Sequence, residues 1–109
     1  MAWLVRDGEV LCTLEVAAGM AGRMRGLLGR DGIDGAIVLK PTRSVHTLKM
    51  RFAIDVAFCD KGLVVVDTVC MVPNRVSRPR RRARCVIEAE AGAFERWRLV
   101  PGDCLEIRE

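Results

Sequence analysis

The chain has 109 residues, of which 50% are hydrophobic and 29% are charged. This length suits one domain, expected to span residues 1–109, and the composition excludes an intrinsically disordered chain. The formal net charge is +4, but the excess is local, because residues 75–84 contain six arginines and no acid. The basic charge therefore describes one segment of the chain rather than its whole surface.

Cysteine content and the N-terminus bear on the cellular compartment. The five cysteines include no C-x-x-C pair, so we expect no zinc site, no disulfide framework and no cofactor. No segment approaches the ~20 apolar residues of a membrane span. Charged Arg6 and Asp7 follow the N-terminus before a signal sequence can form. These features predict a cytoplasmic protein whose cysteines serve as small hydrophobic residues in a reducing compartment.

Turn residues divide the first third of the chain. Residues 3–6 and 10–16 flank Asp7-Gly8 and predict a β-hairpin. Alternation within residues 10–16 predicts that one set of side chains faces the core, namely Val10, Cys12, Leu14 and Val16. Apolar residues then recur at helical spacing, so residues 20–28 predict a short amphipathic helix.

The middle of the chain consists of short apolar runs separated by turns. Strands are expected at residues 36–39, 45–48, 54–59 and 63–72. The tripeptide Asp60-Lys61-Gly62 joins the last two of these in the clearest hairpin of the sequence. So many short segments indicate mostly β structure.

A polar segment opens the last third of the chain. Residues 73–82 contain two prolines and most of the clustered arginines, which predicts a solvated loop. A strand is expected at residues 84–90, where Glu88 and Glu90 share one face. We expect both carboxylates to be solvated or paired with arginines of the loop.

The C-terminal residues complete the expected fold. A second short helix is predicted at residues 91–99 and a final strand at residues 104–108. Together the segments predict a mainly β protein. We expect a compact barrel-like or curled antiparallel sheet of about seven or eight short strands with two short helices, an arrangement that limits exposed strand edges.

A set of short motifs, taken in order, resembles the signatures of one family. They are Arg-Met-Arg-Gly-Leu-Leu-Gly-Arg at residues 23–30, Ile-Asp-Val-Ala-Phe at 54–58, Asp-Lys-Gly at 60–62, Ile-Glu at 87–88, Ala-Gly at 91–92 and Gly-Asp at 102–103. On these motifs the chain resembles DUF192 (UPF0127), a family of small proteins with no assigned biochemical function. The resemblance covers residues 20–107 and implies a compact β-rich fold.

One segment departs from the family pattern. Family members often carry an aromatic-Met-Lys-Asn-Thr run before the Asp-containing strand, whereas this chain has Val-His-Thr-Leu-Lys-Met-Arg at residues 45–51. Site residues of that run are therefore not carried over. Many relatives also begin with a signal or lipoprotein sequence; we expect none in this chain, so the resemblance implies no extracytoplasmic role.

His46, the sole histidine, lies nine residues before Asp55. A two-residue turn at Met50-Arg51 would place the two side chains opposite each other, and the carboxylate would then orient the imidazole as a general base. That arrangement predicts a small hydrolase-type enzyme. The turn lacks the Gly or Asn that such hairpins prefer, so a structural histidine is the competing interpretation. Whether the protein is an enzyme stays open.

Asp55 lies among apolar residues of an expected strand. It is therefore either turned to solvent or buried with a cationic partner such as Arg25 or Lys49. A contact between Asp55 and Arg25 would tie helix to sheet and give the carboxylate a structural role. The same neighbourhood predicts a ligand-binding pocket formed by Arg25, His46, Lys49, Arg51 and Asp55.

The arginine cluster is the sharpest charge feature of the sequence. It consists of Arg75, Arg78, Arg80, Arg81, Arg82 and Arg84. It predicts a surface for a small anionic ligand or for an acidic protein partner. Nucleic acid is disfavoured, because residues 73–84 contain no aromatic side chain to stack on bases and no known binding motif.

The sequence as a whole favours a non-catalytic ligand-binding or accessory module without a metal site. Two alternatives stay open. One is a small hydrolase-type enzyme that uses His46 and Asp55. The other is weak association with nucleic acid through residues 75–84, which would fall steeply with salt.

Overall fold

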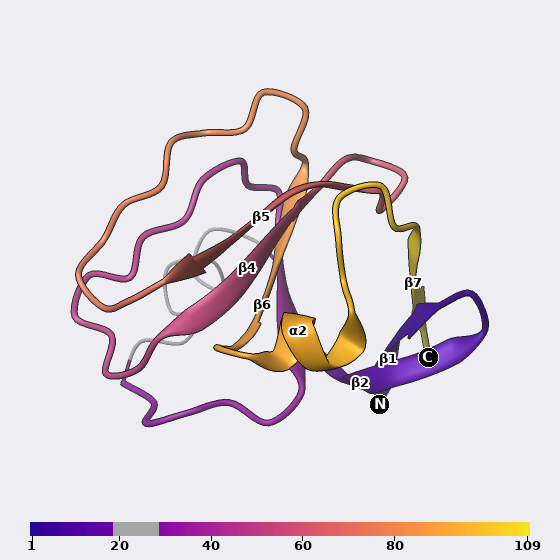
Figure 1. Cartoon of the computed structure of the whole chain (residues 1–109), viewed down its shortest axis with the longest axis horizontal. Coiled ribbons are helices and arrows are strands. Elements are labelled where there is room, and N and C mark those ends of the chain that lie inside the picture. Colours follow the sequence, from indigo (N-terminus) through magenta and orange to yellow (C-terminus); the bar gives the residue numbers. More distant parts are fainter. Residues whose placement is uncertain (19–28) are drawn as a thin grey trace.

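The computed structural model describes residues 1–18 and 29–109, and within these ranges seven strands form one sheet with a single short α-helix (Figure 1). The elements are β1 (Ala2–Arg6), β2 (Glu9–Ala18), β3 (Ala36–Lys40), β4 (Ile54–Cys59), β5 (Val65–Met71), β6 (Cys85–Glu90), α2 (Ala93–Trp97) and β7 (Leu105–Arg108). The strand order is β5-β4-β6-β3-β2-β1-β7. The predicted mainly β fold is confirmed.

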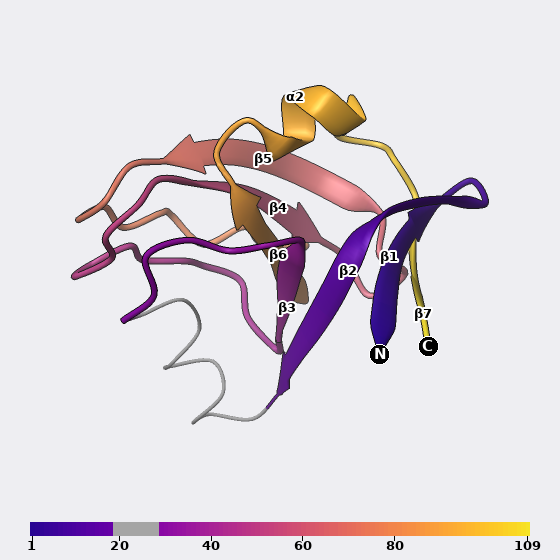
Figure 2. The same ribbon diagram turned by 90° about the horizontal axis from the view of Figure 1, so that it is seen from below.

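The sheet curls until its two ends meet (Figure 2). Val64, just before β5, bridges Cys104, just before β7, and the N–H of Val65 donates to the carbonyl oxygen of Asp103 over 2.9 Å. Adjacent strands are antiparallel except β2 and β3, which run parallel. That parallel pair departs from the expected antiparallel sheet, while the half-barrel shape agrees with the expected curling.

Both hairpins predicted from turn residues form. Asp7 and Gly8, between β1 and β2, have φ values of 51° and 80°, the left-handed conformation that the residues of a tight hairpin turn require. Between β4 and β5, Oδ1 of Asp60 accepts hydrogen bonds from the N–H groups of Gly62 (2.9 Å) and Val64 (3.0 Å). Turn residues of this kind can be recognised in a sequence because their conformations and hydrogen bonds involve only near neighbours.

Successive strand residues point to opposite faces of the sheet, and both faces are buried. The first, here the helix face, lies under α2 and includes Leu4, Leu14, Ala36, Val38, Ala57, Cys59, Ile87, Ala89, Ala93 and Phe94. The second, here the loop face, includes Ile37, Leu39, Val45, Met50, Ile54, Val56, Phe58, Met71, Ala83 and Val86. Residues 41–53 and 72–84 contribute Val45, Met50 and Ala83 to the loop face. The central strands β4 and β6 are therefore covered on both sides.

Several expected elements differ in the structure. Residues 45–48 form no strand, and only an isolated bridge joins His46 to Val76. The expected helix at residues 91–99 is the shorter α2. The expected helix at residues 20–28 lies outside the described residues.

The expected core-facing set of β2 is only partly correct. Leu14 is buried, but Val10 and Val16 are 51% and 43% exposed. The register between β1 and β2 shifts between Leu4 and Val5, so Cys12 pairs with Leu4 but Val10 pairs with Val5. A β-bulge therefore interrupts the strict alternation that the prediction assumed. Val16 lies beyond Leu14, the last residue of β2 that pairs with β1.

Candidate functional site

Strand β5 has a hollow on each of its two sides. The register with β4 pairs Val69 with Val56 and Cys70 with Asp55. Val56 belongs to the loop face, so consecutive residues of β5 point to opposite faces of the sheet. The hollow on the loop-face side is rich in arginine, and the hollow on the helix-face side contains two acids.

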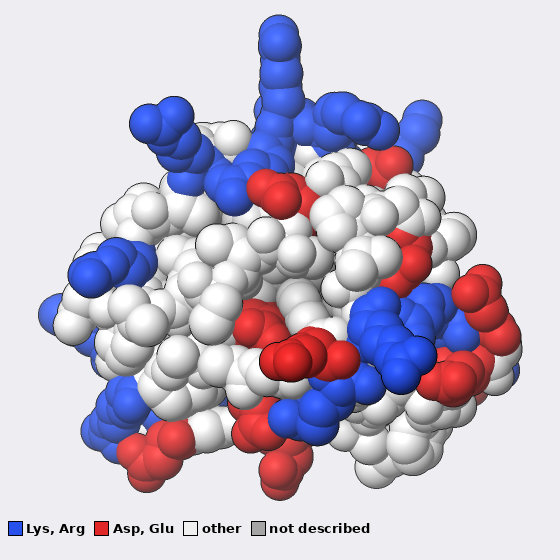
Figure 3. All heavy atoms as spheres, in the orientation of Figure 1, with Lys and Arg blue, Asp and Glu red and all other residues white. Residues whose placement is uncertain are grey.

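The first hollow, here the arginine groove, has a volume of about 410 Å³. It is lined by Val69, Cys70, Met71, Val72, Arg75, Val76, Ser77, Arg78 and Arg80. Val72 and Val76 are 49% and 69% exposed, so apolar surface lies open beside the guanidinium groups. Basic side chains gather along the border of the molecule near residues 73–84 (Figure 3). The groove thus offers apolar contact and positive charge together.

Buried Thr47 fixes the segment that carries these arginines. Its Oγ1 donates to the carbonyl oxygen of Val72 (2.7 Å) and accepts from the N–H of Arg75 (2.9 Å). The carbonyl oxygen of Thr47 also accepts from the N–H of Asn74 (2.8 Å). Because a hydroxyl can donate and accept at once, this one side chain holds the beginning of the arginine segment close to the end of β5.

The three arginines of the groove have different environments. Nε of Arg80 donates to Oδ2 of Asp67 (2.9 Å), and its guanidinium carbon lies 4.3 Å from the centre of the Phe58 ring. Arg75 and Arg78 are exposed, and no carboxylate in the described part of the chain forms an ion pair with either. Arg80 therefore serves the fold, while Arg75 and Arg78 present charge that a ligand can use.

The second hollow, here the acidic pocket, has a volume of about 360 Å³. It is lined by Asp55, Thr68, Val69, Cys70, Gly92, Phe94 and Glu95. Asp55 is 7% exposed, and its Oδ2 accepts from the N–H groups of Gly92 (3.0 Å) and Phe94 (3.1 Å). These are free N–H groups of the first turn of α2, where a carboxylate is favourable. Asp55 thus ties β4 to α2. In Figure 3, acidic side chains lie along part of the border of a central hollow, and basic side chains lie on another part.

Cys70 lies between the two hollows, opposite Asp55. Partial burial, together with a hydrogen bond to Asp55 and the charge of its carboxylate, raises the pKa of the Cys70 thiol above its usual value. A cysteine reacts as a nucleophile through its thiolate. The pKa shift therefore favours the thiol form of Cys70 over its thiolate.

Among the residues predicted to form a ligand pocket, the four that the structure describes do not converge. Asp55 pairs with Cys70 and Ala89 rather than with His46, so the predicted placement of His46 opposite Asp55 is wrong. The physical reason is that residues 45–51 do not form a hairpin with β4 and lie instead against residues 74–77.

The other predicted pocket residues have separate surroundings. Lys49 is exposed, and its backbone N–H donates to Oδ1 of Asn74 (3.0 Å). Exposed Arg51 forms an ion pair with Asp31 (2.9 Å). Arg25 lies outside the described residues, so the expected contact between Arg25 and Asp55 stays a prediction.

The arginine cluster is divided by the structure. Arg75, Arg78 and Arg80 line the groove, whereas Arg81, Arg82 and Arg84 are exposed outside its lining. Nη1 of Arg84 donates to the carbonyl oxygens of Arg81 (3.2 Å) and Ala83 (2.8 Å). Half of the predicted anion surface therefore forms a concave site.

Glu88 is buried, in contrast to the solvated or arginine-paired position predicted for it. It is 3% exposed, and it pairs with Ile37 and Val56 on the loop face. Burial raises its pKa to about 7, and no hydrogen bond or ion pair joins it to another residue that the structure describes. Its neighbour Glu90 is exposed and pairs with Arg96 (3.0 Å), not with an arginine of the loop. The expectation that Glu88 is solvated or paired with the loop is wrong.

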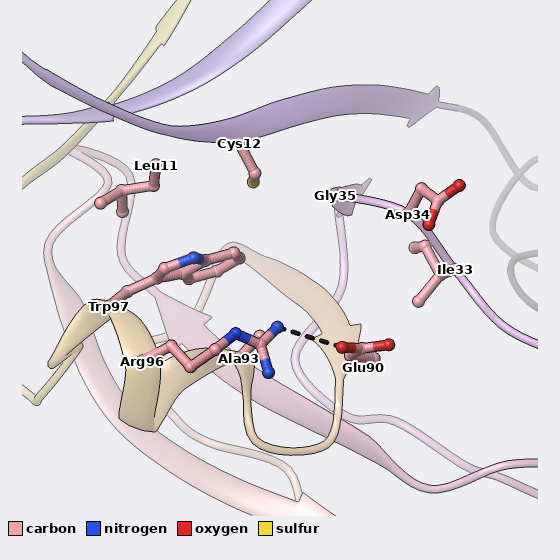
Figure 4. A pocket seen from close by; sticks show the side chains of 9 residues that line it. All are labelled: Leu11, Cys12, Ile33, Asp34, Gly35, Glu90, Ala93, Arg96 and Trp97. Carbon is pink, nitrogen blue, oxygen red and sulfur yellow. Dashed lines mark hydrogen bonds and ion pairs between the residues drawn. The ribbon is translucent and has the colours of Figure 1, made fainter.

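A third pocket of about 240 Å³ lies between β2, α2 and the residues before β3 (Figure 4). Its lining includes Cys12, Trp97 and the Glu90–Arg96 ion pair. Burial raises the pKa of Cys12 to about 11, which keeps the thiol protonated. The pocket therefore offers an aromatic wall and a neutralised ion pair but no activated thiol.

Residues 1–18 and 29–109 contain neither a metal-ligand cluster nor a membrane-spanning helix. No group of three or more His, Cys, Asp or Glu side chains there is arranged to hold a metal ion. No helix in these ranges has the length and apolar character needed to cross a membrane.

Comparison with known proteins gives consistent results. Residues 2–107 match the family DUF192, described as "Uncharacterized ACR". A UPF0127 protein of Pyrococcus furiosus is 41% identical over 108 residues, which covers 94% of this chain and 93% of the relative. A UPF0127 protein of Pyrococcus horikoshii is 32% identical over 102 residues, which covers 89% of this chain and 85% of the relative.

Two solved structures are similar to the whole chain. One is a proposed transcription regulator from Sinorhizobium meliloti 1021, with a TM-score of 0.81 and 23% identity, covering 96% of this chain and 90% of that chain. The other is a protein of unknown function from Novosphingobium aromaticivorans DSM 12444, with a TM-score of 0.81 and 17% identity, covering 96% of this chain and 82% of that chain. At these identities the likeness concerns the fold alone.

Proposed function

The chain belongs to the uncharacterised DUF192 (UPF0127) family, and from this premise we propose that it is a non-catalytic binding module for an acidic partner or a small anionic ligand. The arginine groove is the binding site. The observation that carries the proposal is the pairing of exposed Arg75 and Arg78 with exposed apolar Val72 and Val76 in one groove.

The groove is suited to binding because its charge is available and its frame is fixed. Thr47 anchors residues 72–75, and Arg80 is already neutralised by Asp67. A bound carboxylate or phosphate therefore meets Arg75 and Arg78 without first displacing a carboxylate, since, among the described residues, Nη1 of Arg75 donates only to the carbonyl oxygen of Asn74 (3.3 Å). Preorganised, planar guanidinium groups recognise such anions in two-point geometry.

The two alternative functions have less support. A hydrolase built on His46 and Asp55 requires a contact that the strand pairing does not provide, and Asp55 already accepts two N–H groups. Association with nucleic acid shares the arginines but lacks aromatic side chains in residues 73–84. The name of the Sinorhizobium meliloti protein nevertheless makes a short DNA duplex a necessary competitor in the experiment.

The test is an NMR titration of the ¹⁵N-labelled protein with a blocked hexaglutamate peptide, at about 30 mM and about 150 mM salt. We expect shifts at residues 69–80. The double substitution Arg75→Ala with Arg78→Ala should weaken binding roughly tenfold, since each exposed ion pair contributes up to about 1 kcal/mol.

The matched control removes the same charge from the same segment outside the groove. Arg81→Ala with Arg82→Ala should change affinity less than about threefold, through long-range attraction alone. Equal losses in the two double variants would contradict the proposal, because charge without a defined site would then explain the binding. A peptide that causes no shifts at residues 69–80 would do the same.

A further inference from the structure

Strand β5 is an edge strand for most of its length. It stands at one end of the strand order and pairs with β4 on one side. On its other side, the beginning of the strand is occupied, because Val65 exchanges hydrogen bonds with residues 102 and 103. No described strand pairs with the outer edge from Val66 onward. An exposed edge of this kind presents unpaired backbone groups to another chain.

The hydrogen bonds show which backbone groups of β5 point outward. The N–H of Thr68 donates to Oδ1 of Asp67 (2.9 Å) rather than to β4, and the carbonyl oxygen of Val72 accepts from Thr47. Alternate residues of a strand direct their N–H and C=O groups to the same edge. The outward groups therefore include the C=O of Thr68 and both the N–H and C=O of Cys70, and no described residue hydrogen-bonds to them.

The two hollows flank this free edge on opposite faces of the sheet. Val69 and Cys70 line both of them. Side chains of a strand added beside β5 would alternate between the faces. One row would enter the arginine groove beside Arg75 and Arg78, and the other row would enter the acidic pocket beside Glu95 and Phe94.

We propose that the partner is an extended peptide segment that adds to the outer edge of β5 as a further strand. Its acidic side chains lie in the arginine groove and alternate with basic or apolar side chains in the acidic pocket. This inference rests on the function proposed above and specifies the partner. Main-chain hydrogen bonds supply affinity in such complexes, and the pockets for alternate side chains supply specificity.

Charge favours this peptide partner over a second copy of the chain. Antiparallel pairing of two β5 strands about a two-fold axis would place the same face of both sheets side by side, which would bring the two arginine grooves together. Each copy also carries a formal net charge of +4. Like charges across an interface oppose association, whereas a segment of alternating charge complements both hollows.

The first experiment compares two peptides of identical composition in the NMR titration. One is acetyl-Thr-Glu-Lys-Glu-Val-Glu-Thr-amide, which alternates, and the other is acetyl-Thr-Lys-Val-Glu-Glu-Glu-Thr-amide, which does not. We expect the alternating peptide to bind roughly fivefold more tightly and to shift the amide of Cys70. Equal affinities would overturn the inference that both hollows are used.

The second experiment tests the backbone directly. The alternating peptide is prepared with N-methyl groups either on two of its Glu residues or on its Lys and Val. In an added strand only one of these sets directs its N–H groups to β5, so one peptide should lose at least about tenfold in affinity and the other should retain it. Equal binding of both methylated peptides would mean that no strand is added, while the proposed function of the groove would stand.

A variant of the protein gives the complementary measurement. Cys70→Pro removes an N–H group that points away from β4, at an edge position where proline is tolerated, and Cys70→Ser retains that group. We expect the proline variant to lose about tenfold in affinity and the serine variant to bind as the wild type does. Equal binding by a folded proline variant would overturn the proposal, and if that variant fails to fold, the methylated peptides decide.

Two further outcomes of the titrations concern competition by DNA and the absence of peptide binding. A short DNA duplex that displaces the peptide and shifts only residues 75–84 would overturn both the proposed function and the strand addition. If neither of the two unmethylated peptides binds, both proposals are contradicted as well. If the two unmethylated peptides bind equally, and the two methylated peptides also bind equally, the strand addition alone is contradicted.

Discussion

The helix face and the loop face of the sheet each bury one carboxyl group, in different surroundings. On the helix face, Asp55 accepts hydrogen bonds from two N–H groups of the turn that begins α2. On the loop face, Glu88 has apolar strand neighbours and no described hydrogen-bond partner, and burial raises its pKa to about 7. The comparison separates a carboxylate that stabilises the fold from a carboxyl group that is favourable there only when protonated.

Removal of Asp55 should give the largest loss of stability. Asp55→Ala leaves two N–H groups without their acceptor in a partly buried place, so we expect the free energy of unfolding to fall by about 3–4 kcal/mol. Asp55→Asn keeps an acceptor oxygen and should lose about half as much. Urea denaturation followed by circular dichroism measures both changes.

Glu95→Ala is the matched control, because this exposed acid lines the same pocket and no described N–H group of α2 donates to its carboxylate. Its effect should stay within about 0.5 kcal/mol. If Asp55→Ala were as stable as the control, the carboxylate would not hold α2 to the sheet, and the distinction between the two faces would fail.

Glu88→Gln should have an effect that depends on pH. The ordinary pKa of this carboxyl is 4.5, and the folded value is about 7, so the folded state retains a proton that the unfolded state releases between these values. Wild-type stability should therefore fall as pH rises from 4.5 to 7, by up to about 3 kcal/mol, while the variant keeps its stability. Urea denaturation at pH 4, 6 and 8 tests this.

At pH 4 the variant and the wild type should differ little, because the wild-type carboxyl is then neutral in both states. Glu90→Gln, which removes an exposed carboxyl two residues away on the same strand, serves as the control for the loss of a charge from β6. A Glu88→Gln protein that is less stable than the wild type at pH 8 would show that Glu88 is charged and paired in the fold. Glu88 would then resemble Asp55.

These two residues also show how far the sequence predicts the structure. Asp-Gly at residues 7–8 and Asp-Lys-Gly at residues 60–62 determine their hairpins locally. The alternation of β6 is equally visible, but whether Glu88 faces water depends on residues 41–53 and 72–84, which cover the loop face. Alternation assigns a face, and only tertiary structure determines whether that face is buried.

The candidate site depends on contacts between residues that lie far apart in the sequence. Asp55 and Gly92 are 37 residues apart, and Thr47 and Arg75 are 28 apart. The arginine cluster was recognisable as a charged surface, whereas its division into three residues that line a groove and three that do not follows from Thr47 and β5. The parallel pairing of β2 with β3 likewise has no local signal in the sequence.

The smallest expected effects lie within the arginine groove and distinguish fold from function there. Arg80→Ala removes the ion pair with Asp67 and the contact with the Phe58 ring, so we expect a loss of roughly 1–2 kcal/mol in the free energy of unfolding. Arg78→Ala removes an exposed side chain and should change stability by less than about 0.5 kcal/mol. Thermal and urea unfolding of the two variants measure the difference. Equal stabilities would mean that Arg80 is as available to a ligand as Arg78, and the groove would then present three arginines instead of two.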